Sequence, residues 1–392
     1  MHFTSSTRNR SIRNRSTRPI LALALVGCLV AAGCSDDSKG ADSTTPSSVG
    51  LVTTTTEKAA ATSTSATTVE TQPTESTEVG ETTTTVPAGP TYPLTGLPLT
   101  DPAAANRPAM VVKIDNHPDA RPQSGLNEAD IVYEENVEHQ TRFAAVFQSS
   151  SAEPVGPIRS GRTQDVDLLG SLNKPIFAWS GGNPKVSAAI NGSDLVPVNE
   201  TRAGKAMFRN KGRKAPHNLY GSMSALYTFA PPDAAAPAQQ FLYRPGGASP
   251  AGEASDGVKV SMDGIRVHWQ WDATAGTYLR FSDDKVHKDA INDDQLSTNN
   301  VVVLNVDYKP SPADPNSPEA QTEGFGVAWI FSGGMVIKGA WVRADRLQPF
   351  SLQDDAGNPV LLTPGRTFIE LARGGKSVII PAGTDPDSIT YK

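Results

Sequence analysis

The feature that most constrains this chain is a long stretch, residues 35–90, that is dominated by threonine and serine. No aromatic residue occurs between Phe3 and Tyr92. Such a segment buries too little apolar surface to offset the chain entropy that folding would cost. We therefore expect a disordered tether over residues 34–90, so that residues 91–392 must build the folded part.

The first 33 residues have the pattern of a secretory signal peptide. Five arginines precede a short apolar run at residues 20–32, and small residues then lead to Cys34. This order resembles a bacterial lipoprotein signal, in which the Cys receives a diacyl (palmitate-type) lipid and becomes the mature N-terminus. Cys28 is a second candidate, but cleavage there would leave the apolar residues 29–32 exposed, so Cys34 is the predicted lipid anchor. The predicted location is the extracytoplasmic face of the bacterial cell membrane.

Charge and cysteine content exclude several classes of protein. The formal net charge is -6, and removal of residues 1–33, which hold five arginines and no acid, makes it more negative. A nucleic-acid-binding protein needs a basic surface, so that class is not expected. Two cysteines rule out a disulfide scaffold and a cysteine-rich metal site. The expected partners are the membrane, through the lipid, and a cell-wall component or an envelope protein.

The pattern of the folded part divides it into two domains, residues 91–236 and 237–392, at a proline-rich segment. The first domain mixes strands with helices and is expected to be α+β or α/β. Its strands are predicted at residues 109–114, 131–137, 142–148 and 175–179, and its helices at 163–172, 185–190 and 222–229.

The second domain is predicted to be mostly β, a small barrel or sandwich. Its strands are predicted at residues 265–271, 278–281, 301–306, 326–330, 336–342, 360–362, 367–371 and 378–380. Residues 245–257 are expected to be a loose segment, and residues 310–323 a long polar loop.

Several phrases of the folded part resemble the YerB-like bacterial lipoproteins, a two-domain family without a known function. In the first domain the phrases are YPLTGLP (92–98), RP (107–108), IDN (114–116), ARPQSGL (120–126), ADIVYE (129–134), TRF (141–143), GPIRSGR (156–162) and PHNLY (216–220). In the second they are NNVVV (299–303), GFG (324–326), Trp341 and PGRT (364–367). The resemblance implies a two-domain lipoprotein and brings no catalytic residues.

Polar residues of the first domain suggest a site for an anion. Arg159 and Arg162 flank the predicted start of a helix, where unpaired N–H groups and the helix dipole favour negative charge. Arginine also binds phosphate and carboxylate through two hydrogen bonds at once. The candidate residues for this site are Arg121, Arg142, Arg159, Ser160, Arg162, Gly181, Gly182, His217 and Asn218. The alternative is that the arginines form structural ion pairs with nearby acids, among them Glu128, Glu134, Glu135 and Asp165.

The sequence contains no Gly-x-Ser-x-Gly elbow, Walker loop or dinucleotide-binding motif. We therefore expect a binding protein rather than an enzyme, with no catalytic residue and no cofactor. The remaining histidines, His117 among them, have no metal-site spacing, and the only metal-ligand candidate is Asp130. An alternative follows from a looser resemblance to the LytR–CpsA–Psr phosphotransferases. It would make Asp130 a ligand of Mg²⁺ and make Arg142, Arg159 and Arg162 the clamp for a pyrophosphate.

Overall fold

The computed structural model describes residues 89–392, which lie within one compact unit. The signal peptide, Cys34 and the predicted tether up to residue 88 lie outside the described residues. Among the helices of residues 89–392, none has both the length and the apolar character needed to cross a membrane.

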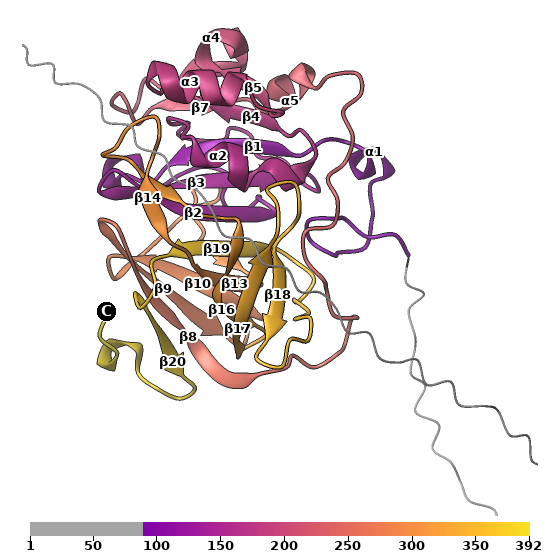
Figure 1. The fold of residues 1–392 in the computed structure, drawn as a ribbon, viewed down its shortest axis with the longest axis vertical. Helices are drawn as coiled ribbons and strands as arrows, with labels where there is room; N and C mark the ends of the chain where they lie inside the picture. Colours follow the sequence, from indigo (N-terminus) through magenta and orange to yellow (C-terminus); the bar gives the residue numbers. More distant parts are fainter. Residues whose placement is uncertain (1–88) are drawn as a thin grey trace, which may run out of the picture. The chain divides into compact units, whose positions relative to one another are not determined.

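A single hydrogen-bonded sheet runs through the unit in the order β11-β10-β9-β8-β17-β16-β13-β19-β2-β3-β1-β4-β5 (Figure 1). Its first-half strands are β1 (Met110–Asp115), β2 (Ile131–Val137), β3 (Gln140–Phe147), β4 (Ile176–Trp179) and β5 (Val196–Asn199). From the second half come β8 (Glu253–Met262), β9 (Ile265–Asp272), β10 (Thr277–Ser282), β11 (Lys285–Val286), β13 (Asn300–Asn305), β16 (Gly324–Ser332), β17 (Met335–Arg343) and β19 (Thr367–Ala372).

The other elements are short and lie beside this sheet. Strands β12 (Ser297–Thr298), β18 (Ser351–Asp354) and β20 (Ser377–Pro381) pair with it off the main path, while β6 (Met207–Arg209) pairs with β7 (Leu219–Gly221) and β14 (Tyr308–Pro310) with β15 (Pro318–Ala320). The helices are α1 (Pro102–Ala105), α2 (Gln164–Leu168), α3 (Pro184–Asn191), α4 (Glu200–Ala203) and α5 (Met223–Leu226), with 3-10 turns at Pro118–Ala120, Gly170–Leu172, Gly204–Ala206, Tyr227–Phe229 and Pro386–Ser388. All five helices belong to the first half, so the predicted fold class is confirmed.

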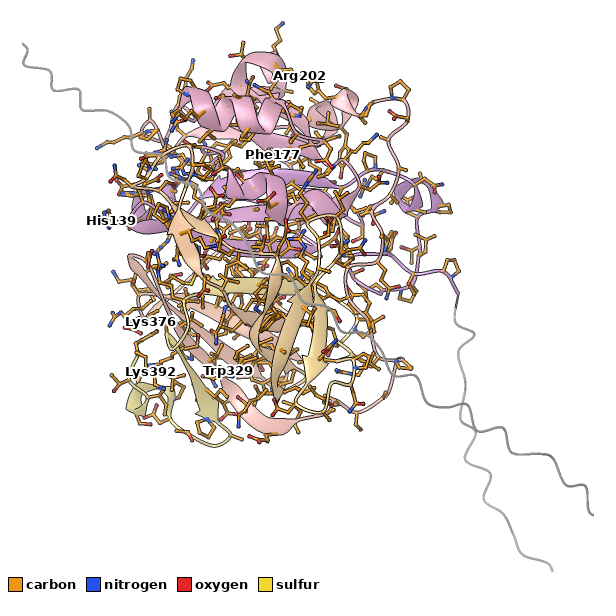
Figure 2. All side chains as sticks on the ribbon, viewed as in Figure 1. His139, Phe177, Arg202, Trp329, Lys376 and Lys392 are labelled. Carbon is orange, nitrogen blue, oxygen red and sulfur yellow. The ribbon has the colours of Figure 1, made fainter. Side chains whose placement is uncertain are left out.

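Strand β1 shows why the sheet needs cover on both faces. All of its residues are buried, and successive side chains point to opposite faces of a strand. Val112 and Ile114 join one apolar cluster, with Trp269 and Phe331 of the second half. Val111 joins the other cluster, which contains Phe177 of β4 (Figure 2). Two cores therefore lie on the two sides of the sheet.

The second half differs from the prediction in several segments. Residues 360–362, expected to be a strand, contain only an isolated bridge at Leu362, and strands β11, β12 and β18 were not expected. Strand β8 begins at Glu253, inside the segment expected to be loose, because its pairing with β9, β17 and β20 outweighs the poor strand propensity of its glycine and serine. Residues 308–320 form the β14–β15 pair rather than a free polar loop. The segment packs on the first half, where Asn183 donates a hydrogen bond to the carbonyl of Ala313 at 3.2 Å.

Strands β2 and β19 lie side by side and carry the sheet from the first half into the second (Figure 1). They are parallel, and Ile131 to Glu134 pair with Thr367 to Glu370. The boundary predicted near residue 236 falls in the connection that precedes β8. The backbone hydrogen bonds of the sheet nevertheless cross between the halves at this pair of strands.

A buried ion cluster joins the same two strands to β10. Arg280 is fully buried, and its guanidinium donates to Glu370 at 2.8 Å and to Glu134 at 2.5 Å. The ring of Phe368 lies 4.9 Å from the guanidinium carbon. Trp269 Nε1 donates to Glu370 at 2.8 Å. One cation thus faces two carboxylates. Burial, and then the charge of Glu134, raise the pKa of Glu370 to about 8.

Replacing Arg280 by methionine should lower the free energy of unfolding by about 3–5 kcal/mol, because it leaves two buried carboxyl groups without their cation. Urea unfolding measures this loss. Arg266→Met is the matched control, since Arg266 forms a half-exposed ion pair with Asp284 at 2.8 Å and its loss should cost at most about 1 kcal/mol. Equal losses in the two variants would contradict the role of Arg280.

Glu370→Gln should change how stability depends on pH. A carboxyl group whose pKa is higher in the folded than in the unfolded state takes up a proton on folding. Its contribution is complete below its ordinary pKa of 4.5 and is lost as the pH rises to about 8. Glutamine mimics the protonated form, so wild type should lose stability relative to the variant over this window, by at most about 1.4 kcal/mol per pH unit. Parallel pH profiles would refute this assignment.

Candidate functional site

The candidate site lies where residues 157–161 insert between the carboxyl ends of β1 and β4. Arg159 N donates to the carbonyl of Lys113 at 2.8 Å, and Ser180 N donates to the carbonyl of Arg159 at 2.9 Å. The strands β1, β4 and β5 are parallel. Ligands of open sheets commonly bind outside the carboxyl ends of parallel strands. The inserted segment carries Arg159 and Ser160 and leads to Arg162. It therefore places these three predicted site residues at such an edge.

Arg142 is the centre of this site. It lies near the start of β3, in register between Asp115 of β1 and Glu135 of β2. The residue is 3% exposed, and neither Nε nor Nη1 has a hydrogen-bond partner. Burial, and then the charge of Arg162, lower the pKa of Arg142 to about 9, while Arg159 adds to this effect. The guanidinium therefore stays charged at neutral pH with donors unused.

Arg159 and His217 meet at a buried carboxylate. Asp115 Oδ2 lies 3.0 Å from Arg159 Nε and 2.7 Å from His217 Nδ1. Burial alone would raise the pKa of Asp115. The hydrogen bond from His217 and the charge of Arg142 oppose it, and the pKa is lower than its ordinary value. Asp115 is thus an anion that holds one cationic side chain and orients one imidazole.

Arg162 lies at the outer side of the cluster, where it pairs with Glu138 at 2.5 Å. Burial opposes ionisation of Glu138, but the hydrogen bond and charge of Arg162 outweigh it and lower its pKa to about 2. Both residues line a pocket of about 210 Å³, together with Ser160, Gly182 and Asn183. Of the three arginines, Arg162 is the one that lines this pocket.

The cluster also holds a buried lysine, which fixes the charge balance. Lys113 contacts Glu135 and lies 2.6 Å from Asp165 Oδ1. Burial lowers the pKa of Lys113 to about 8, against the attraction of Asp165. With neutral histidines, the four basic and four acidic side chains of the cluster cancel. The cluster therefore carries no excess of positive charge.

The turn after β4 closes the site. Gly181 has a φ of +91°, which favours glycine, and a Cβ there would lie 2.9 Å from Ser160 Oγ. Its carbonyl accepts a hydrogen bond from Gly161 N at 3.2 Å. Gly182 follows, and Asn183 caps helix α3 by accepting from Val186 N. The predicted residues Ser160, Gly181 and Gly182 thus pack on one another.

Three predicted residues, Arg121, Asn218 and Asp130, are not part of this cluster. Arg121 lies on the opposite face of the sheet, because it binds Asn116, whose side chain alternates with that of Asp115. There it pairs with Asp283 at 3.4 Å and lines a separate pocket of about 480 Å³. Asn218 bonds Arg209 within its own loop.

Asp130 is also distant from the arginines. It precedes β2, whereas Glu135, in register with Arg142, lies near the other end of that strand, so about 17 Å of strand separate them. The Asp130 carboxylate accepts hydrogen bonds from Ser149 and from Gln148 N. The metal ligand and arginine clamp of the phosphotransferase alternative are therefore not brought together.

The sequence reasoning missed the acids that pair with the arginines. Arg159 binds Asp115 and Arg162 binds Glu138, and neither acid was among those proposed for structural pairs. A usable signal was present in the sequence MVVKID, since Lys113 and Asp115 lie in an otherwise apolar strand. Charged residues in a fully buried strand must have partners.

The fold and its sequence match a described family of proteins. Residues 94–236 match the family model described as "Protein of unknown function (DUF3048) N-terminal domain", and residues 258–369 match the corresponding C-terminal domain. The chain belongs to this family.

Among its relatives is a protein of Bacillus subtilis (strain 168) named "Putative lipoprotein YerB". The two are 31% identical over 289 residues, which is 71% of this chain and 85% of the relative. The crystal structure of YerB from Bacillus subtilis aligns with a TM-score of 0.65 and 27% identity, over 74% of this chain and 99% of that one. The predicted resemblance to YerB-like lipoproteins is confirmed.

Replacing Glu138 by glutamine should remove a pH-dependent part of the stability. A carboxyl group with a lowered pKa stabilises the fold above its ordinary pKa of 4.5, and this contribution is lost as the pH falls to about 2. The stability difference between wild type and variant should therefore shrink as the pH falls through that window. Thermal unfolding at several pH values measures it. The exposed Glu323→Gln control should not show the trend, and a constant difference for Glu138→Gln would refute the pairing.

Proposed function

We propose that this protein is a lipoprotein, anchored through Cys34 at the extracytoplasmic face of the membrane, that binds an anionic component of the cell envelope. The candidate site is the arginine cluster formed by Arg142, Arg159 and Arg162. The similarity to a relative named as a lipoprotein and the signal-like residues before Cys34 support the anchoring. The predicted tether would let the folded part reach away from the membrane surface.

The observation that carries the binding proposal is the buried, unpartnered guanidinium of Arg142. A buried charged donor without an acceptor costs free energy, and a ligand oxygen at that place removes the cost. None of the ion pairs within residues 89–392 includes Arg142, although twelve other arginine or lysine residues in that range have one. A structural role alone does not account for an arginine left without a partner in this way.

The geometry favours a small anion or the anionic end of a larger molecule. The neighbouring pocket of about 210 Å³ is too small for a drug-sized ligand. Because the cluster is electrically balanced, the ligand need supply only a few acceptor oxygens, as a phosphate or a carboxylate does. Charge-assisted hydrogen bonds of this kind contribute about 1.5–3 kcal/mol each.

Titration calorimetry of the full chain with pyrophosphate, and with citrate as the carboxylate probe, tests the proposal. Arg142→Met and the Arg159→Ala, Arg162→Ala double variant should weaken binding by about 10- to 100-fold, through the loss of charge-assisted hydrogen bonds. Arg202→Met is the control with the same change of charge, since Arg202 is exposed on α4 (Figure 2) and its guanidinium donates to the carbonyl of Pro197 at 2.6 Å.

Urea unfolding of each variant separates lost binding from lost folding. Folded variants with lost binding, beside a control that binds as wild type does, would support the site. If wild type binds neither probe, or if the cluster variants bind as tightly as wild type, the proposal is wrong.

A further inference from the structure

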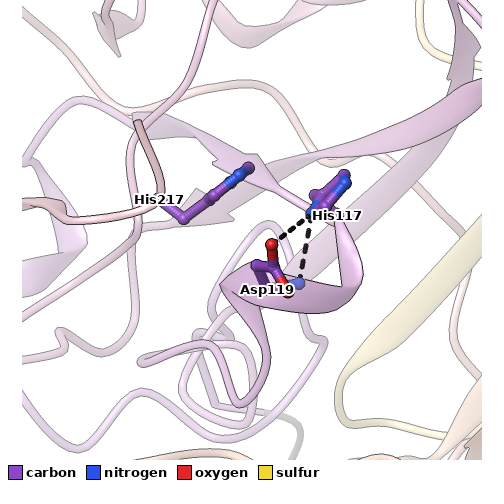
Figure 3. Close-up of side chains that lie close together, drawn as sticks. All are labelled: His117, Asp119 and His217. Atoms are coloured by element: carbon purple, nitrogen blue, oxygen red, sulfur yellow. Dashed lines mark hydrogen bonds and ion pairs between the residues drawn. The ribbon is translucent and has the colours of Figure 1, made fainter. Parts of the chain in front are cut away.

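We propose that His117, Asp119 and His217 bind one divalent transition-metal ion of the kind that imidazole and carboxylate ligands favour, such as Zn²⁺. One ring nitrogen of each histidine and one oxygen of Asp119 lie within 4.8 Å of one another (Figure 3). The two histidines are 100 positions apart in the chain, so no short sequence motif contains both of them. The fold brings them together at the edge of the arginine cluster.

His217 has the arrangement typical of a metal-binding histidine. Its Nδ1 lies 2.7 Å from Oδ2 of Asp115, a fully buried carboxylate. Because Nδ1 faces this carboxylate, Nε2 is the ring nitrogen that is left for an ion. A carboxylate behind the ring fixes the tautomer of a ligand histidine and makes it more basic. The His217 side chain is 12% exposed, which leaves it accessible from outside.

His117 and Asp119 offer the other two ligands from a short turn. Nδ1 of His117 lies 3.8 Å from Oδ2 of Asp119, and it accepts the backbone N–H of Asp119 at 3.1 Å. Accepting that hydrogen bond places the lone pair of the ring on Nδ1, on the side of the carboxylate (Figure 3). Two ligands of a tetrahedral zinc with bonds of about 2.0–2.1 Å lie roughly 3.3 Å apart, so the present spacing is close to the required one.

The remaining adjustment is a reorientation of the imidazole rings, and the His117 side of it falls on exposed groups. The imidazole rings are stacked, with centroids 4.5 Å apart and planes at 15°. Rotation of the rings about their side-chain bonds must turn the two lone pairs to one point. The side chains of His117 and Asp119 are 41% and 76% exposed, so solvent does not hinder this rotation and can replace the lost backbone hydrogen bond.

Three protein ligands leave at least one coordination position of the ion open for water or for another ligand. Imidazole nitrogen suits zinc, copper and nickel, whereas magnesium and calcium prefer oxygen-only sites. The inference does not depend on the anion site. The metal can be tested in the absence of any anion, and Asp115 is the residue that both sites contact.

Titration of the metal-free full chain with Co²⁺, followed by its visible absorption, and competition with Zn²⁺ test the site. Wild type should bind one ion per chain with the absorption of a nitrogen- and oxygen-ligated Co²⁺. The His117→Ala, His217→Ala double variant should lose this binding. Asp119→Asn and the outer variant Asp115→Asn should each weaken it by about 10- to 100-fold.

His139→Asn is the matched control. His139 is an exposed histidine in the turn between β2 and β3 (Figure 2), with a φ of 52° that asparagine tolerates. The control should bind Co²⁺ as wild type does. Circular dichroism establishes that each variant is folded. The proposal is overturned if wild type binds no ion, if the double variant binds as wild type does, or if His139→Asn weakens binding equally.

Discussion

The interaction on which the rest of the structure depends is the burial of one guanidinium between two carboxyl groups. Arg280 comes from β10, Glu134 from β2 and Glu370 from β19, so three strands distant in sequence must meet for any of them to be neutralised. A buried charge without its partner is strongly destabilising. The cluster thus penalises any register of β2 against β19 other than the observed one. That pairing carries the sheet between the two halves and positions β1 and β3 beyond it.

The sequence predicted those strands whose position depends on the pattern of their own residues. The strand expected at residues 131–137 coincides with β2, and β3 differs from its prediction by two residues at the start and one at the end. Both contain β-branched and aromatic residues and lie between turn signals. Strand β8 escaped prediction because its first residues, Glu253 to Gly257, have low strand propensity and are held by three neighbouring strands. Long-range pairing of this kind leaves no local pattern.

The candidate site was predictable only in part, for a similar reason. Arg159 and Arg162 were recognised because arginines beside a turn and a helix start form a local pattern, and Arg142 was added from the start of the preceding strand. Arg121 was grouped with them wrongly, since proximity in sequence does not reveal that its partner Asn116 lies on the other face of β1. His117 was dismissed as a metal ligand because spacing along the chain was the criterion, and His217 was assigned to the anion site instead. Residues that the fold joins across 100 positions cannot satisfy such a criterion.

A single oxygen, Oδ2 of Asp115, contacts both Arg159 and His217. Any event that draws electron density from one side of this atom alters the interaction on the other side. Occupancy at the histidines and occupancy at the arginines would therefore be linked thermodynamically, and the linkage must be reciprocal: each ligand changes the affinity of the other by the same factor. Such communication would pass through one atom at the end of β1, and it would require no movement of the sheet.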